Sequence, residues 1–287
     1  MAALLGIAAP VTTFTLLLAI GMELTTDDFA RVRGQRLLVF AGLFAPFILL
    51  PVFALALTQL LTSPPESTFG VLLIAASPIG TVSNTYCSLA RASMALSITL
   101  TGLSSLVAGI ALPLTGIALE SLLARPFDLQ LPFGLLAVQL LLLLALPVAL
   151  GMVLRRRAPA LAIQLGPRLQ GWSVTGSLVV LILVVLENAT AFVNELSATV
   201  PLAAAFVLTS VLAGWGIAAL ITADRRDRFT ILSEFGARNV AVATTIAVTI
   251  LGRPDFARFA AAYAFVELPL MLAVVALFRR SQAVRAA

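Results

Sequence analysis

Two charged residues and an amide occupy the stretch SEFGARNVAVATT (233–245), which lies in an otherwise apolar part of the chain. Glu234 and Arg238 are four residues apart, a spacing at which side chains pair on a continuous helix. Gly236 lies between them and can interrupt such a helix. Arg238 therefore has three possible roles: a counter-ion for Glu234 or Glu267, a fixed positive charge replacing a bound cation, or a ligand for an anionic substrate.

Side chains that carry oxygen gather in two earlier stretches. In AASPIGTVSNTYCSLAR (75–91), Pro78 and Gly80 interrupt a helix, and oxygen-bearing residues follow the interruption: Thr81, Ser83 and Asn84. In SMALSITLTGLSS (93–105), Ser97 and Thr101 are four residues apart and share one helical face. With Glu234 they form a set of oxygen ligands suited to a hard cation such as Na⁺. The alternative is that the Ser97 and Thr101 hydroxyls bond only to the backbone of their own helix or to a neighbouring helix.

The composition places these residues in a membrane protein. The 287-residue chain is 61% hydrophobic and 11% charged, and apolar runs of about 20 residues recur throughout, each long enough to cross a bilayer as a helix. The alternating short segments of a membrane β-barrel are absent from the sequence. There is no histidine and Cys87 is the single cysteine, so the sequence offers neither the usual base of an intramembrane enzyme nor an internal disulfide.

We predict an all-α polytopic membrane protein with nine transmembrane helices in a single transporter unit (1–287). The predicted segments are 6–24, 36–61, 68–91, 93–122, 133–154, 171–188, 199–222, 229–251 and 257–278. The first lacks the basic leader of a signal peptide and is interpreted as a spanning helix.

The arginines give this count a test, because nine spans place successive loops on alternating sides. Fourteen of the 18 basic residues then fall on one side and three on the other, with Arg238 on neither. The positive-inside rule puts the N-terminus outside and the C-terminus in the cytoplasm. The positions of these arginines at helix ends also explain the net charge of +5 without a nucleic-acid partner.

The two interrupted segments, 68–91 and 229–251, are the third and the eighth. Units offset by five spans run in opposite directions through the membrane, so the pattern predicts an inverted repeat with two crossing discontinuous helices. Interrupted helices in equivalent places of two halves indicate the binding site of a secondary transporter.

The chain resembles the bile acid:sodium symporter family at these stretches. SPIGTVSNTYCSLARASMALSITLTGLSSLVAGIALPLT (77–115) resembles the family's first crossover and the helix after it, and SEFGARNVAVATTIAV (233–248) resembles its second crossover. IGMELTTDDF (20–29) also resembles the end of the helix that precedes the core. The resemblance covers nearly the whole chain and is closest to the family's nine-helix form.

The resemblance implies two domains and a set of ligands. The core domain would comprise approximately 36–122 and 199–278, and the panel domain approximately 6–24 and 133–188. The first sodium site would be formed by five residues: Ser83, Asn84, Ser97, Thr101 and Glu234. Thr81 and Asn239 would face the substrate, as would Arg238 in the third of its possible roles.

The family's second sodium site does not carry over to this sequence. Arg238 stands where the family has a glutamine, and the partner glutamine falls at or near Pro46. A guanidinium has donors and no acceptor, so it cannot ligate Na⁺. We therefore expect one coupling sodium, with Arg238 as the substitute for the second cation.

The expected function is Na⁺-driven symport of a small organic anion by alternating access, in the inner (plasma) membrane, with Na⁺ as coupling ion and no organic cofactor or obligate protein partner. The alternative within transport is a proton-coupled or uncoupled carrier in which Glu234 or Glu267 titrates. An arsenite carrier fits less well, because Cys87 follows the Ser83–Asn84 pair. A sensor with a carrier fold remains a further alternative from another class, and an enzyme is not expected.

Overall fold

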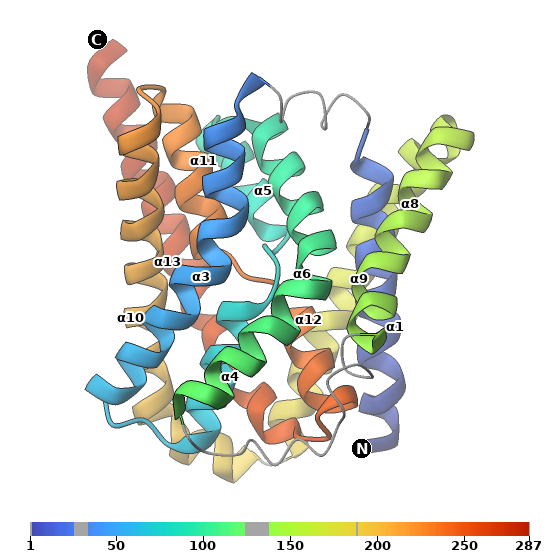
Figure 1. The fold of residues 1–287 in the computed structure, drawn as a ribbon, viewed down its shortest axis with the longest axis vertical. Coiled ribbons are helices and arrows are strands. Elements are labelled where there is room, and N and C mark those ends of the chain that lie inside the picture. The colour runs from blue at the N-terminus through green and yellow to red at the C-terminus, as the bar shows by residue number, and fades with distance from the viewer. Residues whose placement is uncertain (1, 26–33, 124–137, 188, 287) are drawn as a thin grey trace.

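A computed structural model describes residues 2–25, 34–123, 138–187 and 189–286. All the regular elements within these ranges are helices (Figure 1). Some sequence predictions lie outside the described residues: the turn 124–132, the start of the segment predicted at 133–154, and the arginines at 31, 33 and 125.

Seven described helices are long and apolar enough to cross a membrane, and each corresponds to one predicted segment. They are α1 (Ala2–Glu23), α3 (Arg36–Leu60), α6 (Met94–Leu123), the span that joins η1 (Leu141–Ala145) to α8 (Leu146–Arg157), α9 (Pro159–Glu187), α10 (Ala189–Ile221) and α13 (Pro254–Ala286).

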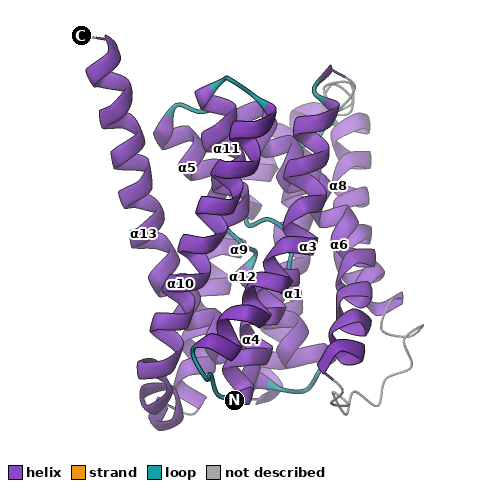
Figure 2. Cartoon of the chain, turned by 60° about the vertical axis from the view of Figure 1, so that its left-hand side comes forward, coloured by secondary structure: helices purple, strands orange, loops and turns teal. Residues whose placement is uncertain are grey.

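The two remaining predicted segments are each divided into shorter helices, at the places where the sequence predicts a break. The segment at 68–91 forms α4 (Pro65–Ala76) and α5 (Val82–Ala90). The segment at 229–251 forms α11 (Arg225–Gly236) and α12 (Val240–Thr245), and α12 continues into η2 (Ile246–Ile250). The loops of both breaks lie midway along the bundle, between helices on every side (Figure 2).

The breaks have local chemical causes. Ser77 precedes Pro78 and has the extended backbone that a following proline favours, with φ −65° and ψ 155°. In the second break, Ala237 and Asn239 are extended and the helix ends at Gly236. Short stretches of extended backbone therefore replace one helical turn at each site.

Two helices begin earlier than hydropathy indicates. α9 begins at Pro159 rather than 171, and α10 at Ala189 rather than 199. The extensions PALAIQLGPRLQ and ATAFVNELSA contain polar side chains, so they do not register as membrane-spanning, although their backbones remain helical. Hydropathy identifies the part of a helix that lies in lipid and not the whole helix.

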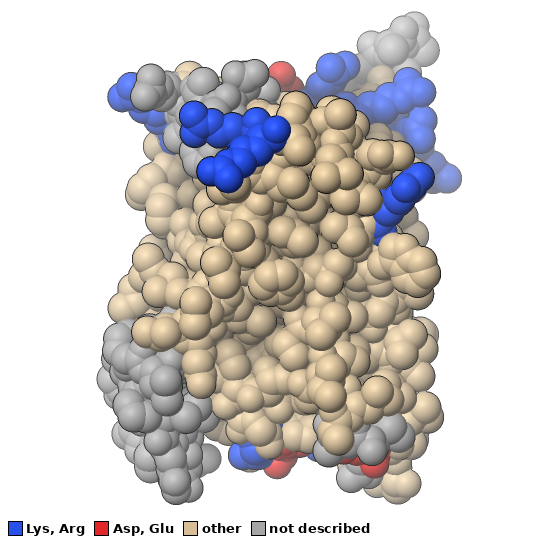
Figure 3. Space-filling model, turned by 90° about the vertical axis from the view of Figure 1, so that its right-hand side faces the viewer, with Lys and Arg blue, Asp and Glu red and all other residues tan. Residues whose placement is uncertain are grey.

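The surface agrees with a membrane environment. The face in Figure 3 has a broad band without charged side chains, and basic side chains are concentrated at its upper end. Large apolar side chains on the long helices are exposed, including Leu212 at 70% and Phe265 at 83%. Such exposure is unfavourable in water and is expected where helices face lipid.

Helix α1 packs against α8 and α9, whereas α10 packs against α3, α11 and α13. Glycines allow the closest approach between α1 and α8: a Cβ atom on Gly21 would overlap the Val148 carbonyl, and one on Gly151 would overlap the Leu18 carbonyl. Small residues that let two backbones touch are typical of helix pairs in membranes.

This contact gives the first prediction. Gly151→Ala should destabilise the protein by about 2 kcal/mol, because the methyl group meets backbone that cannot rotate away. The measurement is the melting temperature in detergent. The matched control is Gly216→Ala in α10, where a Cβ meets nothing within 4 Å and alanine should be neutral or stabilising. Equal melting temperatures for the Gly151→Ala variant and the unmodified protein would contradict the packing argument.

Candidate functional site

The extended segments of the two helix breaks lie against each other and pair as antiparallel backbone. Ile79 and Arg238 form the bridge; the Gly80 amide donates to the Ala237 carbonyl at 2.9 Å, and the Asn239 amide donates to the Pro78 carbonyl at 2.9 Å. Each break thus satisfies backbone groups that the other leaves without a helical partner. Such pairing is needed at membrane depth, where lipid offers no hydrogen bonds.

The pairing requires a glycine at position 80. A Cβ atom there would lie 2.7 Å from the Arg238 carbonyl oxygen, closer than real contacts permit. The two backbones approach at this point, and a larger residue would separate them.

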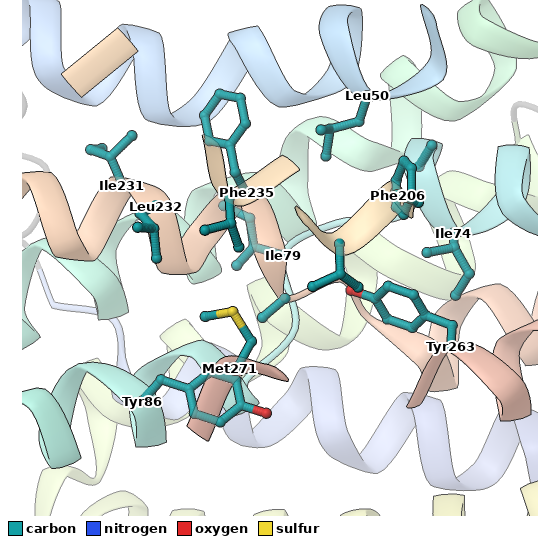
Figure 4. Close-up of a cluster of buried hydrophobic side chains, with 14 of the residues drawn as sticks. Leu50, Ile74, Ile79, Tyr86, Phe206, Ile231, Leu232, Phe235, Tyr263 and Met271 are labelled. Carbon is teal, nitrogen blue, oxygen red and sulfur yellow. The ribbon is translucent and has the colours of Figure 1, made fainter. Parts of the chain in front are cut away.

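The crossing is fixed from two neighbouring helices by residues that the sequence did not single out. The Tyr263 hydroxyl of α13 donates to the Gly236 carbonyl at 2.6 Å and accepts from the Arg238 amide at 3.0 Å. The Ser104 hydroxyl of α6 accepts from the Ile79 amide at 3.1 Å. Figure 4 shows Tyr263 among the buried side chains Phe206, Ile74 and Ile79. The sequence does contain a signal for this contact: Tyr263 lies within the apolar stretch FAAAYAFVE, and a buried tyrosine hydroxyl usually has a hydrogen-bond partner.

The five residues predicted as sodium ligands lie together beside the crossing. They come from three helices: Ser83 and Asn84 from α5, Ser97 and Thr101 from α6, and Glu234 from α11. Glu234 is completely buried, as are Ser83 and Ser97. Three separate elements therefore converge on one carboxylate.

Hydroxyl groups surround the Glu234 carboxylate. Ser97 Oγ lies 2.5 Å from Glu234 Oε1, while Ser83 Oγ and Thr101 Oγ1 lie 3.1 and 3.3 Å from Oε2. Asn84 Oδ1 lies 2.6 Å from the same Ser97 hydroxyl and 3.4 Å from Thr101.

This cluster has more close contacts than hydroxyl protons to share among them. Each of the three hydroxyls carries one proton, yet together they make five contacts with the two oxygens of Glu234 and the amide oxygen of Asn84. Ser97 and Thr101 each lie within hydrogen-bonding distance of two acceptors. A cation bound among these oxygens would take up the contacts that the protons cannot fill, and oxygen atoms are the ligands that hard cations prefer.

The Arg238 guanidinium bonds to backbone at the end of α4. Its Nη2 donates to the carbonyls of Ala75, at 3.4 Å, and Ser77, at the end of α4. Among the described residues, it forms an ion pair with neither Glu234 nor Glu267. The direct counter-ion role that the sequence left open is therefore not found in this geometry.

The other two nitrogens of the guanidinium are buried without a described acceptor. The side chain is 1% exposed, Nε and Nη1 have no hydrogen-bond partner among the described residues, and the group lies 5.5 Å from the Phe47 ring. The permanently charged group therefore retains unused donors in a buried position.

The residues expected to face a substrate lie at the starts of the two half-helices. Asn239 caps α12, with Oδ1 accepting from the Val242 amide at 3.1 Å, and its buried Nδ2 has no hydrogen-bond partner in the part of the chain that the structure describes. Thr81 directly precedes α5 and its side chain does not cap that helix. Donors at these helix starts would attract an anion.

Comparison with known proteins decides the family. The model of the sodium bile acid symporter family matches residues 10–195. The chain belongs to this family. Sodium bile acid symporters are transporters and not enzymes, and the match covers the first of the two crossover motifs, at residues 77–115.

Individual relatives agree with the family match. The chain is 27% identical over 238 residues to a probable sodium/metabolite cotransporter, BASS1, of Arabidopsis thaliana chloroplasts, covering 83% of this chain and 58% of that protein. It is 31% identical over 151 residues to the uncharacterized sodium-dependent transporter YocS of Bacillus subtilis, covering 52% and 46%. It is 29% identical over 237 residues to human sodium/bile acid cotransporter 4, covering 80% and 53%. The chain spans about half the length of these relatives.

The second prediction concerns the tyrosine that clamps the crossing. Tyr263→Phe should lower the free energy of unfolding by about 2 kcal/mol, because the Gly236 carbonyl and the Arg238 amide both lose a buried partner. The measurement is thermal unfolding in detergent. The control is Ser210→Ala, which removes an equally buried hydroxyl that bonds only to a carbonyl of its own helix. Similar losses in the two variants would count against a special role for Tyr263.

Proposed function

We propose that this protein is a secondary active transporter that imports a small organic anion together with Na⁺. The observation that carries the proposal is the buried Glu234 cluster beside the paired helix breaks. The cluster offers oxygen ligands suited to Na⁺, and it lies beside the paired backbone of the two helix breaks. The proposal is supported by the family's name and by the sodium dependence in the names of its relatives.

The proposed architecture has nine spans in two inverted repeats, with α4–α5 and α11–α12 as the crossing discontinuous helices. In support, α4 and α12 occupy the lower half of the molecule and α5 and α11 the upper half (Figure 1). The backbones of the two breaks also pair antiparallel.

We assign α3–α6 and α10–α13 to a core domain, and α1, α8 and α9 to a panel domain. The packing of α1 against α8 and α9 favours this division. The membrane would be the plasma membrane, with the N-terminus outside and the arginine-rich end of the molecule in the cytoplasm.

The proposed sodium ligands are the oxygens of five residues: Ser83, Asn84, Ser97, Thr101 and Glu234. When Na⁺ binds, the hydroxyls turn their oxygens inward and the carboxylate supplies the charge. The site joins α5, α6 and α11, so ion binding stabilises the arrangement of both half-helices at once. This is how an ion can favour one conformation of the core.

We propose that Arg238 replaces a second cation and contacts the substrate. Its bonds to carbonyls place the guanidinium at the C-terminal end of α4. The partial negative charge of a helix C-terminus stabilises a cation at this position. Its unused Nε and Nη1 donors lie on different edges of the guanidinium, and each can donate to an oxygen of an anionic substrate. The Asn239 amide and the start of α5 at Thr81 would complete the contacts to the anion.

The third prediction tests the sodium site. NaCl should raise the melting temperature of the purified protein relative to choline chloride, because a ligand that binds the folded state stabilises it. Glu234→Gln should weaken this response by about tenfold in Na⁺ concentration or more, a loss of roughly 1.4 kcal/mol. Glu195→Gln is the matched control, since Glu195 pairs with Arg258 instead. An undiminished response in Glu234→Gln would remove Glu234 from the site.

The fourth prediction tests Arg238. An organic anion is first found by a stability screen of organic acids with and without Na⁺, and its uptake is then measured in proteoliposomes. Arg238→Gln should weaken uptake and make it depend more steeply on Na⁺, because the neutral amide can ligate an ion.

Arg238→Lys is the control, since it keeps the positive charge with a different arrangement of donors and should keep the weaker dependence on Na⁺ of the unmodified protein. If uptake does not change with the Na⁺ gradient in either the unmodified protein or Arg238→Gln, both the sodium site at Glu234 and the proposed role of Arg238 are overturned. Uptake that follows a pH gradient alone would favour a proton-coupled carrier.

A further inference from the structure

A second carboxylate is buried in the membrane region, away from the proposed sodium ligands. Glu267 of α13 is 5% exposed, and its neighbours Phe265 and Leu268 are turned outward at 83% and 48%. Its side chain thus faces the interior. An ionisable group in this position is costly to maintain and is a candidate for function.

The surroundings of Glu267 do not neutralise a negative charge. Its Oε2 accepts from the Tyr86 hydroxyl of α5 at 3.1 Å, and its Oε1 has no hydrogen-bond partner among the described residues. It forms no ion pair in the described part of the chain. A carboxylate with one neutral donor and no cation is poorly stabilised when ionised in a protein interior.

The groups around Glu267 limit what it can bind. The titratable groups that face it are Tyr86 from α5 and Tyr263 on α13 itself; the Tyr263 hydroxyl is engaged by the second break. Arg238 extends toward Ala75, Ser77 and Phe47 instead. From α10, Glu195 pairs with Arg258, which is nine residues before Glu267. One carboxylate and one hydroxyl are too few oxygens for a metal cation, whereas a proton requires a single oxygen.

We propose that Glu267 is a proton-binding site of this transporter, separate from the ion site at Glu234. The inference rests on the proposed transport function and adds a second ion to it. The proton neutralises the carboxylate while the site is closed, and its release requires a conformation in which water reaches α13.

The position of Glu267 connects this proton to the crossing. Ser83, which bonds to Glu234, and Tyr86, which bonds to Glu267, are three residues apart on the nine-residue helix α5. On the other side, Tyr263 precedes Glu267 by one helical turn and holds the Gly236 carbonyl and the Arg238 amide. A change of charge at Glu267 therefore acts on both half-helices that flank the breaks.

The first test detects the proton directly and requires no substrate. Infrared difference spectra of the purified protein, recorded between acidic and alkaline pH, should contain the carbonyl stretch of a buried carboxylic acid. This band should persist in Glu234→Gln and be lost in the double variant Glu234→Gln/Glu267→Gln. A double variant that keeps the whole band would overturn the proposal.

The second test asks whether the proton matters for transport. Na⁺-driven uptake should vary with pH in the unmodified protein and vary much less in Glu267→Gln. Tyr86→Phe is the comparison, because it removes the hydrogen bond but keeps the carboxylate and should keep a pH response. Equal pH dependence in the unmodified protein and in Glu267→Gln would refute coupling to transport.

The two proposals fail separately. If Glu234→Gln loses its stabilisation by NaCl but the infrared band does not depend on Glu267, the sodium site stands and the proton site falls. If the band depends on Glu267 but Na⁺ has no effect on stability or uptake, the sodium proposal falls and Glu267 remains a proton site.

Discussion

The antiparallel pairing of two helix breaks is the contact on which the rest of the structure depends. A single break would leave backbone amides and carbonyls without partners at membrane depth, and each such group costs several kcal/mol there. Here Gly80, Ala237, Asn239 and Pro78 exchange the missing bonds. The exchange holds four helix ends at one place, with donors from the residues that precede α5 and α12 and acceptors from the residues that follow α4 and α11. The proposed sodium ligands and substrate contacts lie at or beside these ends.

Much of this centre can be predicted from sequence because its causes are local. Pro78 and Gly236 determine where helices end, and the spacing of Ser97 and Thr101 places both hydroxyls on one face. The crossover motifs add the expectation that these residues meet Glu234, and the five side chains do lie together. The types of the residues and their spacing are enough to predict such features. Each feature depends on neighbours within a few positions or on a motif shared with the family.

Other features depend on how distant helices cross, and the sequence does not determine them alone. The four-residue spacing of Glu234 and Arg238 suggested a pair, but the break at Gly236 rotates the arginine toward Ser77. The link from Tyr263 to Gly236 spans 27 residues and two elements. The early starts of α9 and α10 were missed because polar residues continue a helix outside lipid. In each case the missing information is the three-dimensional path of the chain.

The proposed role of Arg238 has a thermodynamic consequence for the transport cycle. A dissociable cation is taken up on one side of the membrane and released on the other, so its gradient contributes to the work of transport. A guanidinium is tethered and permanently charged, so it returns to its starting state in every cycle and takes no energy from an ion gradient. It can strengthen binding but cannot drive accumulation, because a ligand shifts an equilibrium only through unequal affinity for two states. Accumulation of the anion must then depend on the ion at Glu234 and on any proton carried by Glu267. If Arg238 replaces the second cation, the carboxylate of Glu267 would be the group through which a further ion is coupled to transport.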